Sequence, residues 1–347
     1  MVRFIVHGGY GKTATTFLQE KIFFHLDDVL YLGKFNSKMI HEELHKFYYT
    51  IFPSFVGMVS FIRARNSSLL ISCFGDVLLR KMKQTDKNII LLSNENLFDF
   101  ANYNAELNML LLLKLFNYLQ DNYNEQIEFK VMMTIRNQKD FLKSFYAFDF
   151  THLKNRFSSF EKFIRYGIEN KHEIVFGGCH YDVVLEDMKR LYGQDNIRFF
   201  IYEKMEDELE SYLNDIFQFI GTVHKLDALD YKQKVNVNSK NGVHKIRQVK
   251  YGLIATVIIG TYRYVKPMLR LLEKTNAFLT LRKTAQQYCT NSMKVIDRGS
   301  LGDFSHELAS DIDDVYVKSN SRLSRMLGVE LKKYGYVGGT FECEHVQ

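Results

Sequence analysis

The sequence predicts an α/β fold of three layers, in which a central, mainly parallel sheet is flanked by helices. Continuous apolar runs that end at polar residues are typical of buried parallel strands, and such runs occur at 88–93 (NIILLS), 129–135 (FKVMMTI) and 196–202 (NIRFFIY). Segments with apolar residues at helical spacing separate these runs, as at 105–119. The alternation of strands and helices therefore predicts a sheet between two layers of helices.

The first stretch of the chain, residues 4–17, reads FIVHGGYGKTATTF and predicts a strand, a tight loop and a helix. Phe4–Val6 are strand formers, and apolar residues at helical spacing follow the loop. Between them lie three glycines that let the backbone turn sharply and approach a ligand: Gly8, Gly9 and Gly11. This pattern predicts that the loop binds something closely at the end of the strand.

The loop suits a phosphate-like anion, because its backbone N–H groups and the positive end of the following helix point at one spot. Lys12 adds a mobile positive charge, so the site is P-loop-like. In ATP- and GTP-binding P-loops a glycine stands five residues before the Gly-Lys-Thr, but Val6 occupies that position here. No aspartate run or Walker-B pattern follows to hold a metal. A Mg²⁺-dependent P-loop kinase is therefore the alternative and not the first interpretation.

The remaining elements follow in chain order. We expect strands at 29–32, 88–93, 129–135 and 196–202. We expect helices at 40–49, in the second half of 61–79, at 105–119, after Arg136, and at 158–169, 181–192 and 209–220.

Polar residues follow three of the predicted strands where each strand ends. Glu95 follows the strand at 88–93, Arg136 follows the next one, and Tyr202 ends the third. Ligands bind at the carboxyl ends of strands in such sheets, so we expect these residues near Lys12. An arginine at a strand end and a hydroxyl on the next helix, here Ser144, can grip a phosphate together.

Lys12-Thr13-Ala14-Thr15-Thr16 resembles the 5′-phosphosulfate loop of the sulfotransferases, Lys-Thr-Gly-Thr-Thr, with Ala14 in place of the glycine. Arg136 and Ser144 resemble the second signature of this family, an arginine at a strand end and a serine eight residues later. The segment 317–336 is similar to the closing helix and turn of bacterial sulfotransferase-domain proteins, so the resemblance implies a closing helix there. The resemblance covers roughly residues 1–340, with sharp motifs at only four places.

The resemblance implies the cofactor 3′-phosphoadenosine-5′-phosphosulfate (PAPS), the product 3′,5′-adenosine bisphosphate (PAP), and no metal. Tyr202, in a Tyr-Glu-x-Met pattern, corresponds to the residue beside the adenine, although a tyrosine that only packs is the alternative. The implied cofactor-binding residues are Gly11, Lys12, Thr13, Ala14, Thr15, Thr16, Arg136, Ser144 and Tyr202, with Lys240 and Gly242 as candidates in the basic window at 232–250.

The resemblance also implies the catalytic roles. Lys12 would stabilise charge on the leaving phosphate, and Glu95 would be the general base for the acceptor hydroxyl. His7 is the second candidate for the base or a positioning residue. A glutamate with a pKa of about 4 is a weak base, so burial would have to raise that pKa. The resemblance favours a carbohydrate or glycolipid acceptor, such as a polysaccharide precursor, with a lipid, a peptide tyrosine or a natural-product hydroxyl as the alternatives. A non-catalytic protein that binds PAP is a further alternative.

We expect a single domain over 1–340, with a helical insertion or lid at 251–300 and a tail at 341–347. The apolar and basic segment 251–284 has several interpretations: an acceptor-side lid, an oligomer contact, a membrane-surface helix, or helices packed on the domain. We expect at most peripheral membrane contact, because the longest apolar run, 109–113, is far too short to span a bilayer.

The composition of the chain narrows the class of protein further. The net charge of +6 is mild, which fits an anionic cofactor and does not require nucleic acid. The four cysteines lie far apart and look like reduced thiols, and no secretory signal is apparent, so we expect a cytoplasmic protein. The high content of Phe and Tyr is compatible with a homodimer contact.

Overall fold

The computed structural model describes residues 1–10, 13–35, 38–39, 41, 44, 59–98, 105–154, 156–224, 244–250, 294–301 and 303–339. The chain divides into two compact units. The first consists of Met1–Leu142, Ile164–Val237 and Phe304–Gln347, and the second of Lys143–Phe163 and Asn238–Asp303.

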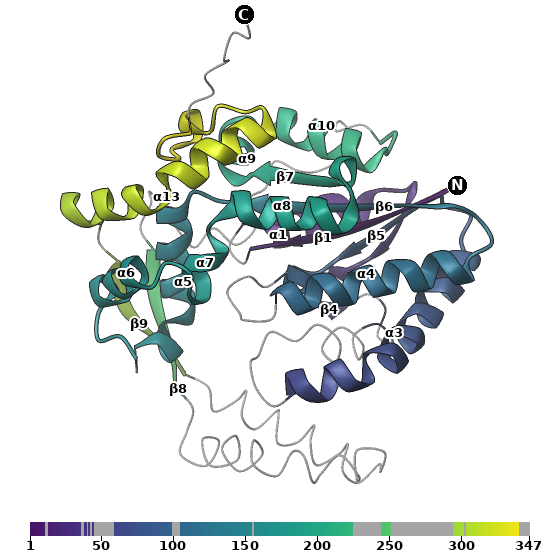
Figure 1. Cartoon of the computed structure of the whole chain (residues 1–347), viewed down its shortest axis with the longest axis horizontal. Coiled ribbons are helices and arrows are strands. Elements are labelled where there is room, and N and C mark those ends of the chain that lie inside the picture. Colours follow the sequence, from purple (N-terminus) through teal and green to yellow (C-terminus); the bar gives the residue numbers. More distant parts are fainter. Residues whose placement is uncertain are drawn as a thin grey trace, which may run out of the picture. The chain divides into compact units, whose positions relative to one another are not determined.

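The first unit contains a sheet in which every described strand pairing is parallel. Its strands, in sheet order, are β2 (Val29–Leu32), β5 (Ile89–Ser93), β1 (Val2–Gly9), β6 (Ile127–Ile135) and β7 (Ile197–Ile201). β1 lies in the centre, with His7 opposite Ser93 of β5 and Gly9 opposite Thr134 of β6. Figure 1 shows these strands side by side with helices around them.

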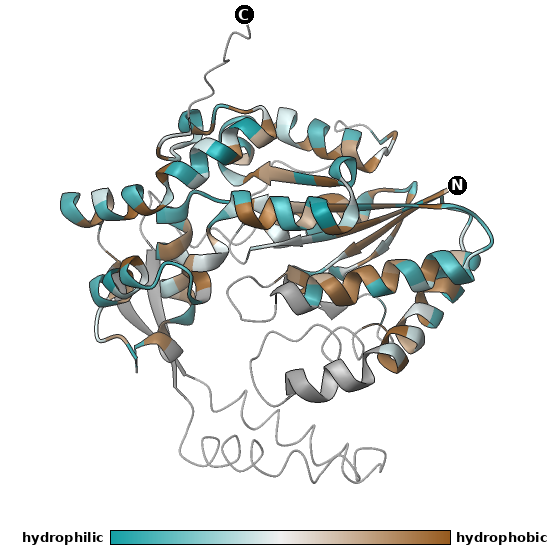
Figure 2. Ribbon diagram, viewed as in Figure 1, coloured by the Kyte–Doolittle hydropathy of each residue, from teal (hydrophilic) through white to brown (hydrophobic). Residues whose placement is uncertain are grey.

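Both faces of the sheet are covered, because alternate residues of each strand point to opposite sides. On one face, Ile5 of β1 and Met132 of β6 share a core with helix α10 (Leu209–Ile220) and the turns after the first loop. On the other face, Phe4 and Phe129 pack against Phe116, whose ring stacks on that of Phe129 at 4.3 Å. In Figure 2 the flanking helices carry both hydrophobic and hydrophilic residues along their length, as amphipathic helices do. The predicted three-layer α/β class is confirmed.

The helices of the first unit begin and end as follows: α1 (Thr15–Phe17), π-helical turn η1 (Leu18–Ile22), 3₁₀ turn η2 (Phe23–His25), α3 (Val59–Lys83), η3 (Glu95–Phe98), α4 (Ala105–Asn122), α7 (Ile174–Gly178), α8 (Tyr181–Tyr192), η4 (Gln194–Asn196), α9 (Tyr202–Asp207), α10, α13 (His306–Leu327) and η7 (Leu331–Tyr334). Two short strands, β3 (Lys34–Phe35) and β4 (Lys38–Met39), pair antiparallel. α5 (Gln138–Leu153) and α6 (Phe160–Glu169) each have residues in both units.

The second unit contains an antiparallel pair, β8 (His244–Lys250) and β9 (Lys294–Leu301). Its part of α5 carries Tyr146, whose ring lies 5.4 Å from that of Phe163, and Lys143, which forms an ion pair with Asp303 at 2.7 Å. Residues 294–300 of the expected helical insertion belong to β9, and 251–293 lie outside the described residues. The expectation of one domain with an insertion or lid therefore stays a prediction, as does the tail at 341–347.

Several predicted elements have the expected bounds: β2, α8 and α10 coincide with the ranges read from the sequence. The mixed segment 61–79 proves to be part of the long helix α3. The predicted closing helix begins earlier than expected, at His306, where Ser305 caps it by accepting a hydrogen bond from the N–H of Leu308 at 3.2 Å. Most of the helix expected at 40–49 lies outside the described residues.

Candidate active site

The carboxyl ends of four parallel strands meet at one edge of the sheet in the first unit. β1 leads to the Thr13–Thr16 loop, β5 to Glu95, β6 to Arg136, and β7 to Tyr202. The structure therefore brings these sequence-predicted segments to the same edge, which is where such sheets bind ligands.

The loop after β1 is shaped by its own hydroxyls. Thr13 is fully buried and donates a hydrogen bond from Oγ1 to the carbonyl of Tyr10 at 2.6 Å. Ala14 has φ 56° and ψ 24°, in the left-handed region, and its carbonyl accepts the N–H of Leu18 at 3.2 Å. Glycine adopts this conformation at little cost, which explains why the similar family pattern has glycine here.

The loop also contains the buried side-chain hydroxyl of Thr15. Its side chain is 7% exposed, and Oγ1 has no hydrogen-bond partner among the residues that the structure describes. A buried hydroxyl without a partner costs about 1–3 kcal/mol, so such a group is typical of a site that a ligand completes. Gly9 lies beside it, since a Cβ built there would be 3.6 Å from Thr15 Oγ1 and 3.3 Å from Thr13 Oγ1.

The sequence indicates that Gly8 belongs to the tight loop, but the structure places it in a strand. Gly8 and Gly9 are both within strand β1 and not in the turn. A Cβ at Gly8 would lie 2.2 Å from the ring of Phe98. Gly8 therefore makes room for η3, the turn that begins with Glu95, to pack on the end of β1.

His7 and Glu95, the two candidate bases, lie at neighbouring strand ends. His7 is 1% exposed, and its Nδ1 is 2.8 Å from Ser93 Oγ. Gln19 of η1 donates from Nε2 to the same Ser93 Oγ at 3.1 Å. Glu95 begins η3 two positions after Ser93, and its side chain lies outside the described residues. The Ser93 hydroxyl of β5 therefore joins His7 of β1 to Gln19 of η1.

Arg136 directly follows β6, and its guanidinium lies over the ring of Tyr202, with Cζ 4.5 Å from the ring centroid. The backbone carbonyl of Arg136 accepts the hydroxyl of Tyr181 at 2.8 Å. Burial raises the pKa of Tyr202 to about 12, and the Arg136 charge opposes that shift. A guanidinium stacked in this way is preorganised to donate parallel hydrogen bonds to an anion.

Glu203, the residue after Tyr202, is a site residue that the sequence reasoning did not single out. Its Oε1 accepts the backbone N–H of Asn137 at 2.8 Å, and its Oε2 accepts the hydroxyl of Tyr336 at 3.3 Å. Burial raises its pKa to about 7, although the Asn137 N–H and the Arg136 charge oppose the shift. The sequence held two signals for Glu203: its position directly after a buried strand and its place in the Tyr-Glu-x-Met pattern that begins at Tyr202.

This raised pKa has a consequence for stability. Because the folded chain holds the Glu203 proton more tightly than the unfolded chain does, the stability from this group is present below about pH 4.5. It is lost as the pH rises to about 7.

Other predicted site residues are not placed at this edge by the structure. Ser144 lies on α5 in the second unit and is partly exposed. Gly11, Lys12, Lys240 and Gly242 lie outside the described residues, so their predicted roles stay predictions. Cys73 and Cys179 carry free thiols, as expected for those two positions.

The fold and this edge define a P-loop-like α/β domain with the Thr13–Thr16 loop at the end of its central strand and an arginine at the next strand end. The family model described as "Sulfotransferase domain" matches residues 4–250. The chain therefore belongs to the sulfotransferase domain family, as its motifs predicted, and it is a transferase for sulfuryl groups.

Two solved structures are similar to the chain. One is a sulfotransferase from Alicyclobacillus acidocaldarius, with 12% identity, a TM-score of 0.48, and coverage of 96% of this chain and 99% of that one. The other is the sulfotransferase domain of the Synechococcus PCC 7002 olefin synthase, with 12% identity, a TM-score of 0.33, and coverage of 67% and 78%. A comparison with curated protein sequences finds no match.

Two searches of the described residues gave negative results. No helix among them is long and apolar enough to cross a membrane. The same residues contain no group of three or more His, Cys, Asp or Glu side chains that could hold a metal ion.

Proposed function

We propose that the protein uses PAPS as its sulfuryl donor and transfers the group to an acceptor hydroxyl on a carbohydrate or a glycolipid. Membership of the sulfotransferase domain family supports the reaction class. The finer assignment is supported by one observation above all. Two groups suited to the two ends of such a nucleotide, the Thr13–Thr16 loop and Arg136, follow neighbouring strands at one edge of the sheet.

The described residues fit such a group. Thr15 Oγ1 is buried and lacks a partner within the described part of the chain, so a phosphosulfate oxygen would satisfy it. Gly9 keeps the backbone open beside that hydroxyl. Arg136 lies over the Tyr202 ring, where its guanidinium can bind a phosphate and the ring can contact an adenine.

Each residue has a distinct proposed task. PAPS, when bound, supplies the sulfuryl group. Thr15 and Thr16, with the backbone N–H groups of the loop, hold the 5′-phosphosulfate of the nucleotide. Thr13 shapes the loop instead, because its hydroxyl donates a hydrogen bond to the Tyr10 carbonyl. Lys12 neutralises the charge that develops on the leaving phosphate. Arg136 binds the 3′-phosphate.

Glu95 is the proposed general base for the acceptor hydroxyl. It begins η3 at the end of β5, beside the end of β1 that carries the loop. His7 is less suited to this task, because its ring is almost fully buried and its Nδ1 is engaged with Ser93. We therefore assign His7 to positioning the two strand ends.

The test is a transfer assay with labelled PAPS and a panel of sugar and glycolipid acceptors. Glu95→Gln should keep wild-type affinity for PAP and lose turnover by about 100-fold or more, because a general base contributes 10²–10⁴-fold. Lys12→Ala should abolish transfer and weaken PAP binding.

Two results would contradict these roles. An active Glu95→Gln enzyme would move the base to His7 or to another residue. Full transfer by Lys12→Ala would remove that lysine from the mechanism.

A further inference from the structure

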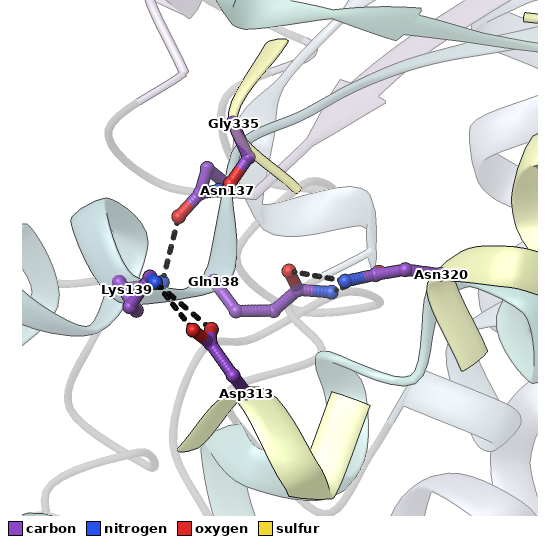
Figure 3. Close-up of polar contacts among 6 residues, drawn as sticks. All are labelled: Asn137, Gln138, Lys139, Asp313, Asn320 and Gly335. Atoms are coloured by element: carbon purple, nitrogen blue, oxygen red, sulfur yellow. Dashed lines mark hydrogen bonds and ion pairs between the residues drawn. The ribbon is translucent and has the colours of Figure 1, made fainter. Parts of the chain in front are cut away.

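The backbone that follows β6 is held by the C-terminal segment of the chain, beyond the part that the family model matches. In Figure 3, Asn137, Gln138 and Lys139 contact Gly335, Asn320 and Asp313, respectively. Asn137 donates from Nδ2 to the carbonyl of Gly335. Gln138 and Asn320 exchange side-chain hydrogen bonds of 2.7 and 3.3 Å, and Lys139 forms an ion pair with Asp313 at 2.8 Å.

Glu203 joins this C-terminal segment to the Arg136 backbone. Its two carboxylate oxygens accept hydrogen bonds from two separate segments, the Asn137 N–H after β6 and the Tyr336 hydroxyl near the C-terminus. Tyr336 is 1% exposed and Asn137 is 6% exposed, so both donors are buried. A carboxylate that receives two buried donors fixes both of them in direction.

The Asn137 N–H belongs to the peptide unit that also contains the Arg136 carbonyl. That carbonyl accepts the Tyr181 hydroxyl at 2.8 Å, so the peptide plane is held at both its N–H and its C=O. The side chain of Arg136 leaves the backbone at this plane and reaches the face of Tyr202, the residue before Glu203. Glu203 and Tyr202 therefore hold the backbone and the guanidinium of the same arginine.

We propose that Glu203 is a positioning residue for Arg136: by bridging the Asn137 N–H and the Tyr336 hydroxyl, it sets the direction in which Arg136 meets the 3′-phosphate of the nucleotide. The inference rests on the proposed function. It adds a role for a carboxylate that does not itself touch the nucleotide, and a role for the C-terminal segment in nucleotide binding.

The test is a titration of PAP and of AMP, which lacks the 3′-phosphate, into the wild type and Glu203→Ala. The variant should bind PAP about 10-fold more weakly, because a misdirected charge-assisted hydrogen bond loses about 1.4 kcal/mol or more. AMP affinity should stay within about twofold, since AMP lacks the 3′-phosphate that Arg136 would bind. A general disturbance of the fold would weaken both ligands.

Two further variants show whether the loss of PAP affinity comes from the hydrogen bonds of Glu203, from its charge or from a less stable fold. Glu203→Gln retains an oxygen for the Asn137 N–H, so it should recover most of the PAP affinity. Tyr336→Phe removes only the second donor and should weaken PAP binding in the same direction, which keeps the test informative where Glu203→Ala does not fold.

Glu208→Ala is the matched control. Glu208 contacts the same C-terminal segment through Lys333 and Tyr334, but it does not reach the end of β6. It should leave the affinity for PAP unchanged.

The outcomes are distinguishable. Equal PAP affinity in the wild type, Glu203→Ala and Tyr336→Phe would overturn the inference, as would an equal loss of PAP and AMP binding. A wild type that binds AMP as tightly as PAP would contradict the proposed 3′-phosphate site itself, and the inference with it.

Discussion

Ala14 occupies a backbone conformation that favours glycine, with φ at 56°. A left-handed conformation costs a residue with a Cβ about 1–2 kcal/mol, and glycine avoids most of this cost. We expect Ala14→Gly to raise the free energy of unfolding by about 1 kcal/mol, measured by denaturant titration.

Ala14→Val is the control for this prediction, because a β-branched side chain is strained further at positive φ and should lower stability. A glycine variant no more stable than the wild type would show that the loop does not hold Ala14 in this conformation.

At the scale of single residues, the sequence predicted the candidate site where a motif names the residue, as for Arg136 and Tyr202. It did not predict Glu203, because which carboxylate is buried against which N–H depends on packing between segments far apart in the chain. It also did not predict that the Thr13 hydroxyl donates a hydrogen bond to the Tyr10 carbonyl. A threonine that shapes the loop and a threonine that binds the ligand give the same sequence pattern.

The element that follows the loop is an irregular helix, in which α1 passes into the π-helical turn η1 and then into η2. Gln19 lies in this π-helical turn and donates to Ser93 of β5. π-helical turns are rare and occur often at functional sites. Here the turn joins the Thr13–Thr16 loop to the strand that leads to Glu95.

We expect Ser93→Ala to lower the free energy of unfolding by about 1–3 kcal/mol, because Gln19 Nε2 and His7 Nδ1 both lose the same buried partner. Thermal and denaturant melts of the purified variant would measure this change.

Ser72→Ala is the control, since the Ser72 hydroxyl donates an exposed hydrogen bond to the carbonyl of Leu69 within α3, and its loss should change stability by less than about 0.5 kcal/mol. Equal effects of the two substitutions would contradict a joining role for Ser93.

At this scale the sequence predicted strands and amphipathic helices well, because their periodicity is a local property. It could not predict the π-helical turn, since Phe17–Phe23 read as an ordinary helix in the sequence.

At the scale of the whole chain, the sequence predicted the layers and the parallel sheet. The chain itself divides into two compact units. The division falls within α5, between Leu142 and Lys143, where the helical pattern is continuous. Ser144 therefore lies in a different unit from Arg136, although the spacing of the two residues matches the family motif.

The C-terminal segment also shows the limit of a sequence match. The family model ends at residue 250, yet Tyr316, Leu323 and Tyr336 are buried in the core of the first unit. This segment holds the backbone beside Arg136, so the candidate site depends on residues outside the matched range.

The central claim, that this edge of the sheet binds a 3′-phosphorylated nucleotide without metal, is tested most directly by calorimetric titration with PAP and with ATP, each with and without Mg²⁺. We expect PAP to bind tightly and independently of Mg²⁺. We also expect Arg136→Ala to weaken this binding by about 10-fold or more, because a charge-assisted hydrogen bond contributes about 1.5–3 kcal/mol. Preference for ATP with Mg²⁺ would contradict the account and indicate an atypical P-loop kinase.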